Sequence, residues 1–146
     1  MKSFIMFLAL TLSFSTFANT TVTAEENNSE LQILDLVVGV TQTYSKTSEL
    51  NAKVVEILGG DGMNPTRMVL VLSTGYEDTK IFNLDPMFYS VTRIVFLAKD
   101  VVVINYLQDS FDNDVDMNTI QVKKSITIQV LRNADGTLAN EVKILK

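Results

Sequence analysis

The sequence predicts an all-β fold, either an antiparallel β-sandwich or a small barrel of about eight strands. The main observation is the stretch 119–131, in which apolar and polar side chains alternate. A period of two places every second side chain on the same side of an extended chain, so one face is expected to be buried and the other wet. Further apolar runs of strand length, separated by turn residues, cover the rest of the chain.

The apolar face of 119–131 is predicted to lie in the core. Its side chains are mostly β-branched and pack well on a pleated surface. They are Ile120, Val122, Ile126, Ile128 and Val130. Lys124 falls on the same side, and we expect its ammonium group to reach water past the sheet edge or at a bulge.

The first strand of the domain is predicted over 31–44 and is expected to be mostly buried. Gly39 within it indicates a bulge or a close approach of the backbone. Its apolar side chains are Leu34, Leu36, Val38 and Val40 on one side, with Ile33 and Val37 on the other. The next stretch, 45–58, is compatible with a helix or a hairpin, and its short β-branched segment 53–58 favours the hairpin.

The remaining strands follow from apolar runs and the breaks between them. A strand over 67–74 is followed by a short edge strand over 79–84, which Asp85-Pro86 is expected to end because proline cannot donate to a ladder. Two strands that are apolar on both faces are expected to be central, with a last strand after a turn at 133–136. These three are predicted over 88–98, 101–108 and 138–145.

The N-terminus reads as a cleaved secretory signal peptide over residues 1–18. Met1-Lys2 is followed by an apolar stretch, and Thr16-Phe17-Ala18 fits a cleavage site, with Ala24 as the alternative end. The apolar stretch is shorter than a spanning helix needs, so no stable membrane insertion is expected after cleavage. The prediction is a periplasmic or secreted protein with a flexible lead over 19–30 and a single β-domain over 31–146.

Composition restricts the partners and the chemistry. With 12 basic and 17 acidic residues, the formal net charge is −5, and no Lys/Arg cluster is seen, so we expect no nucleic-acid partner. The chain has no His, Cys or Trp, which excludes disulfides, Ser-His-Asp and Cys-His catalysis and the usual zinc sites. What remains for catalysis is a pair of carboxylates, as in glycoside hydrolysis, and nothing in the sequence selects such a pair.

The acidic stretch 109–118 is the strongest local signal for a ligand. Asp112, Asp114 and Asp116 match the first, third and fifth positions of a calcium loop, and Asp109 adds a fourth carboxylate. Met117 stands where the turn glycine belongs, and Lys123 stands where the bidentate glutamate belongs. We therefore predict weak calcium binding as an alternative to a solvated hairpin loop with no cofactor.

Two other stretches are candidates for contact with a ligand. The glycines of Gly59-Gly60-Asp61-Gly62 would let the backbone approach a ligand closely, although a plain hairpin connection would use them too. Met87-Phe88-Tyr89 would present apolar side chains to a partner, or else begin a buried strand.

These observations favour an exported, non-catalytic β-domain that acts as a binding module of the cell envelope. Its partner would be an unidentified protein or envelope ligand. The alternatives are a carboxylate-based hydrolase of envelope glycans and a weak calcium-binding protein acting through 109–116.

Overall fold

The computed structural model describes residues 20–24, 36–75, 78–111 and 119–145, which form antiparallel strands and no helix. Strands make up 79% of these residues, so the predicted all-β class is confirmed. No helix in these ranges is long and apolar enough to cross a membrane.

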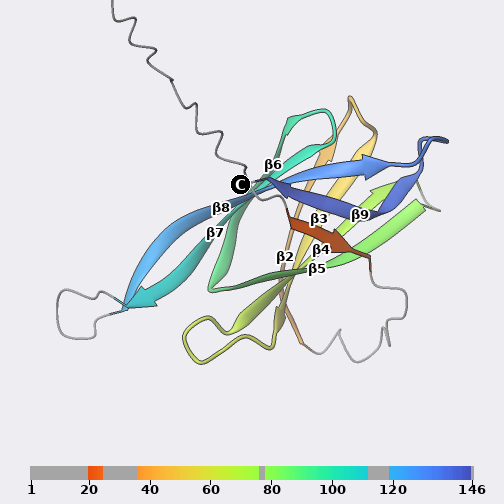
Figure 1. The fold of residues 1–146 in the computed structure, drawn as a ribbon. Coiled ribbons are helices and arrows are strands. Elements are labelled where there is room, and N and C mark those ends of the chain that lie inside the picture. Colours follow the sequence, from red (N-terminus) through yellow and green to blue (C-terminus); the bar gives the residue numbers. More distant parts are fainter. Residues whose placement is uncertain (1–19, 25–35, 76–77, 112–118, 146) are drawn as a thin grey trace, which may run out of the picture.

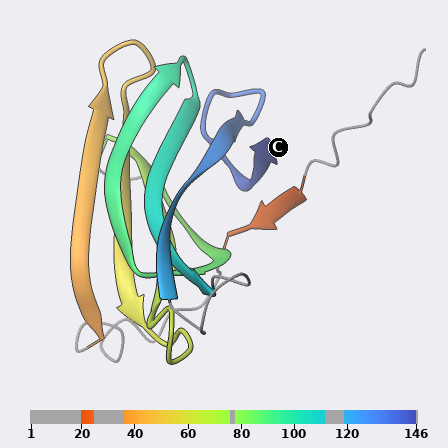
Figure 2. The ribbon, with the colours of Figure 1, turned by 90° about the vertical axis from the view of Figure 1, so that its left-hand side faces the viewer.

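The strands form two antiparallel sheets that lie one against the other (Figures 1 and 2). The five-stranded sheet has the order β1-β9-β8-β7-β6, and the four-stranded sheet has the order β2-β3-β4-β5. The strands are β1 Thr20–Thr23, β2 Val37–Ser45, β3 Leu50–Leu58, β4 Thr66–Thr74, β5 Asp78–Phe88, β6 Ser90–Ala98, β7 Val101–Phe111, β8 Thr119–Arg132 and β9 Leu138–Leu145.

One apolar core fills the space between the sheets. It is built from the inward faces of β3 to β5 in one sheet and of β6 to β9 in the other. Alternate residues of β3 and β4 are fully buried, as expected for strands with one face against a core. The largest fully buried side chains are Phe82, Phe88, Leu50, Met68, Leu70, Leu72, Ile104, Ile128 and Leu138.

Several predicted elements are confirmed. The stretch 45–58 is a hairpin, in which β2 pairs with β3, so the helical alternative is wrong. Strands β4 and β9 fall within one residue of their predicted bounds. Gly39 has both predicted roles: the ladder shifts register between Val37 and Gly39, and a Cβ built on Gly39 would lie 2.8 Å from Oε1 of Glu56.

The prediction that 31–44 is mostly buried is wrong for its described part. Val38 and Val40 are 55% and 57% exposed, and they lie on the outer face of an edge strand. The core-facing side of β2 is instead polar or small, with Gly39, Thr41 and Thr43 only partly buried. The position of Leu34 lies outside the described residues.

Pro86 does not end the strand that contains it. Strand β5 continues to Phe88, and the ladder with β4 shifts register between Arg67 and Met68, opposite the Asp85-Pro86 pair. A proline is tolerated there because β5 is an edge strand, as predicted, and the bulge removes the need for its missing donor.

The prediction of two central strands holds for β7 and is wrong for the preceding strand. Phe88 belongs to the end of β5, and β6 begins at Ser90 and forms an edge of its sheet. Register shifts at Val91/Arg93 and Phe96/Ala98 interrupt its pairing with β7. A strand with apolar side chains on both faces can therefore still lie at the edge of a sheet. Leu97 of β6 is 73% exposed as a result.

The predicted core face of β8 is correct only in its second half. Ile126, Ile128 and Val130 are buried, whereas Ile120 is 43% exposed. The reason is that β7 and β8 pair with each other from end to end, so their shared hairpin runs past the rest of the sheet (Figure 1). Val122 is partly buried and Lys124, on the same side, is exposed.

The N-terminal lead predicted over 19–30 contains a strand. Thr20–Thr23 forms β1, which pairs with the free edge of β9, and Val22 packs against the core. Four residues are too few for the apolar–polar alternation of a strand to be recognised in the sequence. This strand is identified by its pairing with β9.

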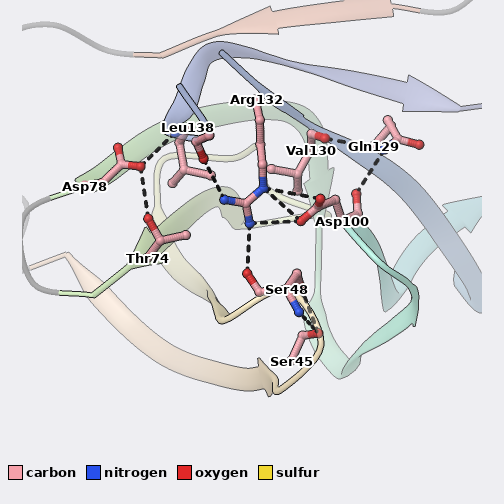
Figure 3. Close-up of polar contacts among 10 residues, drawn as sticks. Ser45, Ser48, Thr74, Asp78, Asp100, Gln129, Val130, Arg132 and Leu138 are labelled. Carbon is pink, nitrogen blue, oxygen red and sulfur yellow. Dashed lines mark hydrogen bonds and ion pairs between the residues drawn. The ribbon is translucent and has the colours of Figure 1, made fainter. Parts of the chain in front are cut away.

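Arg132 joins the turns at one end of the two sheets (Figure 3). Its Nη2 lies 3.0 Å from Oδ1 of Asp100, in the β6–β7 turn, and also donates to the carbonyl of Ser48, in the β2–β3 turn, at 3.0 Å. Nη1 donates to the carbonyl of Gly136, in the β8–β9 turn. Since Ser48 belongs to the other sheet, one guanidinium ties both sheets together at this end.

Glu56 is a carboxylate on the core-facing side of β3, and it is 8% exposed. Its Oε2 accepts the backbone N–H of Val91 in β6 at 3.2 Å, so it bridges the sheets. Burial raises the pKa of Glu56, and the Val91 hydrogen bond opposes this to a lesser degree.

Alanine substitutions along β8 test which part of the strand is buried in the core. We expect Ile128→Ala to lower the free energy of unfolding by about 2–4 kcal/mol, because Ile128 is fully buried. Ile120→Ala should cost less than about 1 kcal/mol, because Ile120 is exposed and lies outside the buried core. Equal losses in urea unfolding would contradict the described position of the hairpin.

Substitution of Glu56 tests the cost of its burial. A carboxyl group whose pKa is raised by folding stabilises the folded protein at pH values below its unfolded pKa, 4.5. This stabilisation is lost as the pH rises through the pKa of the folded state. Glu56→Gln keeps an acceptor for the N–H of Val91 and should therefore raise the melting temperature at pH 7. The gain should disappear toward pH 4, and a gain independent of pH would show that ionisation is not its cause.

Candidate binding hollow

A hollow at the end of the molecule opposite Arg132 brings together three stretches that the sequence singles out. Its volume is about 590 Å³. Its lining residues come from the β3–β4 loop, the corner between β5 and β6 and the far part of the β7–β8 hairpin. The described lining residues are Gly62, Met63, Pro65, Tyr89, Asp109, Phe111 and Thr119.

The glycine-rich loop on this hollow is held by its own hydrogen bonds. Oδ1 of Asp61 accepts the backbone N–H groups of Met63, at 2.9 Å, and of Asn64, at 2.6 Å. The N–H groups of Gly59 and Gly60 both donate to the carbonyl of Pro65, at 3.2 Å and 3.0 Å. An aspartate side chain that accepts the N–H groups of the residues after it commonly fixes a turn. These hydrogen bonds therefore give the loop a defined conformation.

Asn64 connects this loop to β7. Its side-chain oxygen accepts the N–H of Asp109 at 2.8 Å, and its side-chain nitrogen donates to the carbonyl of Asp109 at 3.1 Å. The amide thereby pairs with the backbone of β7 as a neighbouring strand would, and Asn64 is 6% exposed. The loop is consequently fixed relative to Asp109.

The side chain of Asp109 has an oxygen without a partner. Among the described residues, its Oδ1 is the one buried side-chain nitrogen or oxygen atom that makes no hydrogen bond. Nearly all buried polar atoms in proteins are paired, and leaving one unpaired costs free energy. Asp109 therefore lines the hollow with a carboxylate of which one oxygen is buried and unpaired.

Two exposed aromatic residues line the same hollow as Asp109. Tyr89 and Phe111 are 49% and 56% exposed. The backbone of Tyr89 is fixed by its N–H, which donates to the carbonyl of Leu107 at 2.8 Å, and by the hydroxyl of Thr66, 3.4 Å from its carbonyl oxygen. Exposed aromatic rings on a fixed backbone bind apolar groups, and their faces attract cations.

The predicted calcium residues are placed only in part. Asp109 lies in β7 and not in a loop, because the β7–β8 ladder continues to Phe111 opposite Thr119. Asp112, Asp114 and Asp116 lie outside the described residues, so calcium binding there stays a prediction. Within the part of the chain that the structure describes, no three carboxylates are grouped as a metal site would need.

The sequence allowed Met87-Phe88-Tyr89 to be either exposed apolar side chains or the start of a buried strand, and each interpretation holds for part of the segment. Phe88 is fully buried, and its ring lies edge-on to Tyr106 with the centroids 6.0 Å apart. Met87 and Tyr89, on either side of it, are exposed. Alternation along an extended chain therefore buries Phe88 in the core and leaves its two neighbours exposed at the surface.

Two further hollows are lined by strand residues. One, of about 390 Å³, covers the bulged part of β3 to β5 and includes Ile57, Val69 and Ile81. The other, of about 530 Å³, is bordered by Arg93, Lys123 and Lys124. The sequence did not predict this basic group, because Arg93 comes from β6 and only the pairing of β7 with both β6 and β8 brings it near the two lysines.

Comparisons with protein families, with curated proteins and with solved structures find no match. The chemistry of the hollow is therefore argued from its own residues.

The two glycines of the loop provide a matched test of its structure. A Cβ built on Gly60 would lie 1.8 Å from the carbonyl oxygen of Asn64, whereas one built on Gly62 would meet nothing within 4 Å. Gly60→Ala should therefore displace the loop and destabilise the protein by about 1–3 kcal/mol, and Gly62→Ala should leave the melting temperature nearly unchanged. Similar melting temperatures for both variants would contradict the close approach at Gly60.

Proposed function

We propose that this protein is an exported, non-catalytic binding module of β-sandwich type. Its hollow would take a basic side chain, with apolar neighbours, from a protein or other ligand of the cell envelope. The observation that carries the proposal is that Asp109, whose Oδ1 is unpaired, lines the hollow together with two exposed aromatic residues.

The chemistry of the lining favours a cation. The described lining residues include one carboxylate and no Lys or Arg. An ammonium or guanidinium group in the hollow would donate to the carboxylate of Asp109, and such a charge-assisted hydrogen bond is of the stronger kind. The same cation would lie beside the rings of Tyr89 and Phe111, and Met63 and Pro65 would contact the methylene groups that carry it.

The position of β1 bears on the processing of the exported chain. Cleavage after Ala18 would keep Thr20–Thr23, which pairs with β9 through four residues. Cleavage after Ala24 would remove this strand and uncover the edge of β9. We therefore favour Ala18 as the end of the signal peptide, with periplasmic or secreted location as part of the proposal.

The other two functions need groups that the described hollow does not supply. A glycoside hydrolase requires a second carboxylate at about 5–9 Å from the first, and Asp109 is the one acid among the described lining residues. Weak calcium binding would depend on Asp112, Asp114 and Asp116, which lie outside the described residues. Both stay alternatives.

A pair of small probes tests the proposed ligand class. Nα-acetyl-lysine methylamide at millimolar concentration should shift the NMR signals of the Tyr89 ring and the Gly62 amide, whereas Nα-acetyl-glutamate methylamide should not. Asp109→Asn should abolish the response to the lysine probe, because the substitution removes the charge and keeps the shape of the side chain. Equal responses to both probes, or an unchanged response in Asp109→Asn, would refute the proposal.

A further inference from the structure

We propose that a second copy of this chain binds along the free edge of β2, so that two four-stranded sheets join into one continuous sheet across a twofold axis. β2 and β5 are the two edge strands of the four-stranded sheet. The proposed contact at β2 does not depend on the hollow at Asp109. β2 forms one outer margin of the molecule (Figure 2), and in the described part of the chain it pairs with β3 alone.

Three of the four edge strands carry features that prevent pairing with another chain. β1 has only four residues. β5 contains Pro86, several charged residues and a bulge. β6 contains Arg93 and two irregularities in its ladder. Short length, proline, charge and bulges are the usual means by which proteins block their edges.

The edge of β2 has almost none of this protection. Its nine residues, Val-Val-Gly-Val-Thr-Gln-Thr-Tyr-Ser, include no charged residue and no proline. Its single register shift lies at the very start, between Val37 and Gly39, and the pairing from Val40 to Ser45 is regular. An extended, uncharged edge of this length is a template for a further strand.

The strand is self-complementary in an antiparallel register. Centred on Thr41, a β2–β2 pair would place Val40 opposite Gln42 of the second copy and Val38 beside its Tyr44. These four side chains all point to the outer face and are exposed. Valine beside tyrosine is a favourable cross-strand combination, and a twofold pair repeats each contact.

Charge favours β2 over other surfaces for contact between two copies. The chain carries a formal net charge of −5, so two copies repel each other in general. A contact made through the uncharged edge of β2 adds no like-charged pair within the strand itself.

The outer face of the sheet would be continuous across such a contact. Val40 lies opposite Val55 of β3, and Val55 lies opposite Val69 of β4, so an apolar row already spans three of the four strands. Joining two edges extends that row from one copy into the other. The interface is small, so we expect reversible association rather than an obligate dimer.

The test compares oligomeric state among matched variants. Sedimentation equilibrium of the wild-type chain should show a monomer–dimer equilibrium with a dissociation constant of about 10⁻⁴ M or lower. Val40→Lys/Gln42→Lys places like charges opposite each other twice and should weaken dimerisation at least about tenfold. Val40→Glu/Gln42→Glu should do the same. Leu97→Lys, an exposed change on the edge strand β6, should leave the equilibrium unchanged.

Mixing the two charged variants tests the register itself. In a mixed dimer each lysine would face a glutamate, so an equimolar mixture should dimerise although neither variant does alone. Unchanged circular dichroism and melting temperature would show that each variant is folded. A wild-type chain that stays monomeric up to millimolar concentration would overturn the proposal. Dimerisation that the lysine variant leaves intact, or a mixture that does not dimerise, would overturn it as well.

Discussion

The shared apolar layer between the two sheets is the constraint on which the rest of the structure depends. Each sheet has one apolar face, and each of these faces is shielded from water only by packing against the other. The sequence has no cysteine, so no disulfide assists this packing. The paired inner faces of β3 and β4 and of β7 and β8, with Met68, Leu70, Ile104 and Ile128 fully buried, supply this stabilisation.

Polar residues at the two ends determine how the sheets are joined around that layer. At one end, Arg132 binds three turns and links the sheets through Ser48. At the other end, Asn64 connects the β3–β4 loop to β7 through its amide. The first arrangement satisfies its charge within the protein. The second leaves an oxygen of Asp109 without a partner, and this difference is why we place the ligand at the second end.

The candidate site could be predicted in its parts and not as a whole. The glycine loop, the segment Met87-Phe88-Tyr89 and Asp109 each stood out by composition. Their meeting at one hollow depends on the pairing of β4 with β5 and on the length of the β7–β8 ladder. Composition carries no information about which loops share an end of a sheet. For the same reason, the grouping of Arg93 with Lys123 and Lys124 was not foreseen.

The sequence by itself determined the all-β class, most strands and which side chains of β8 share a face, because alternation over eight or more residues indicates an extended strand. It favoured a hairpin over a helix at 45–58 without excluding the helix, and it indicated a bulge or close approach at Gly39, both of which the structure shows. Only the tertiary structure decided which strands lie at edges, and therefore that Val38 and Val40 face water and that Pro86 is accommodated in β5. The physical reason is that periodicity states which side chains share a face. Burial of that face depends on what another part of the chain places against it.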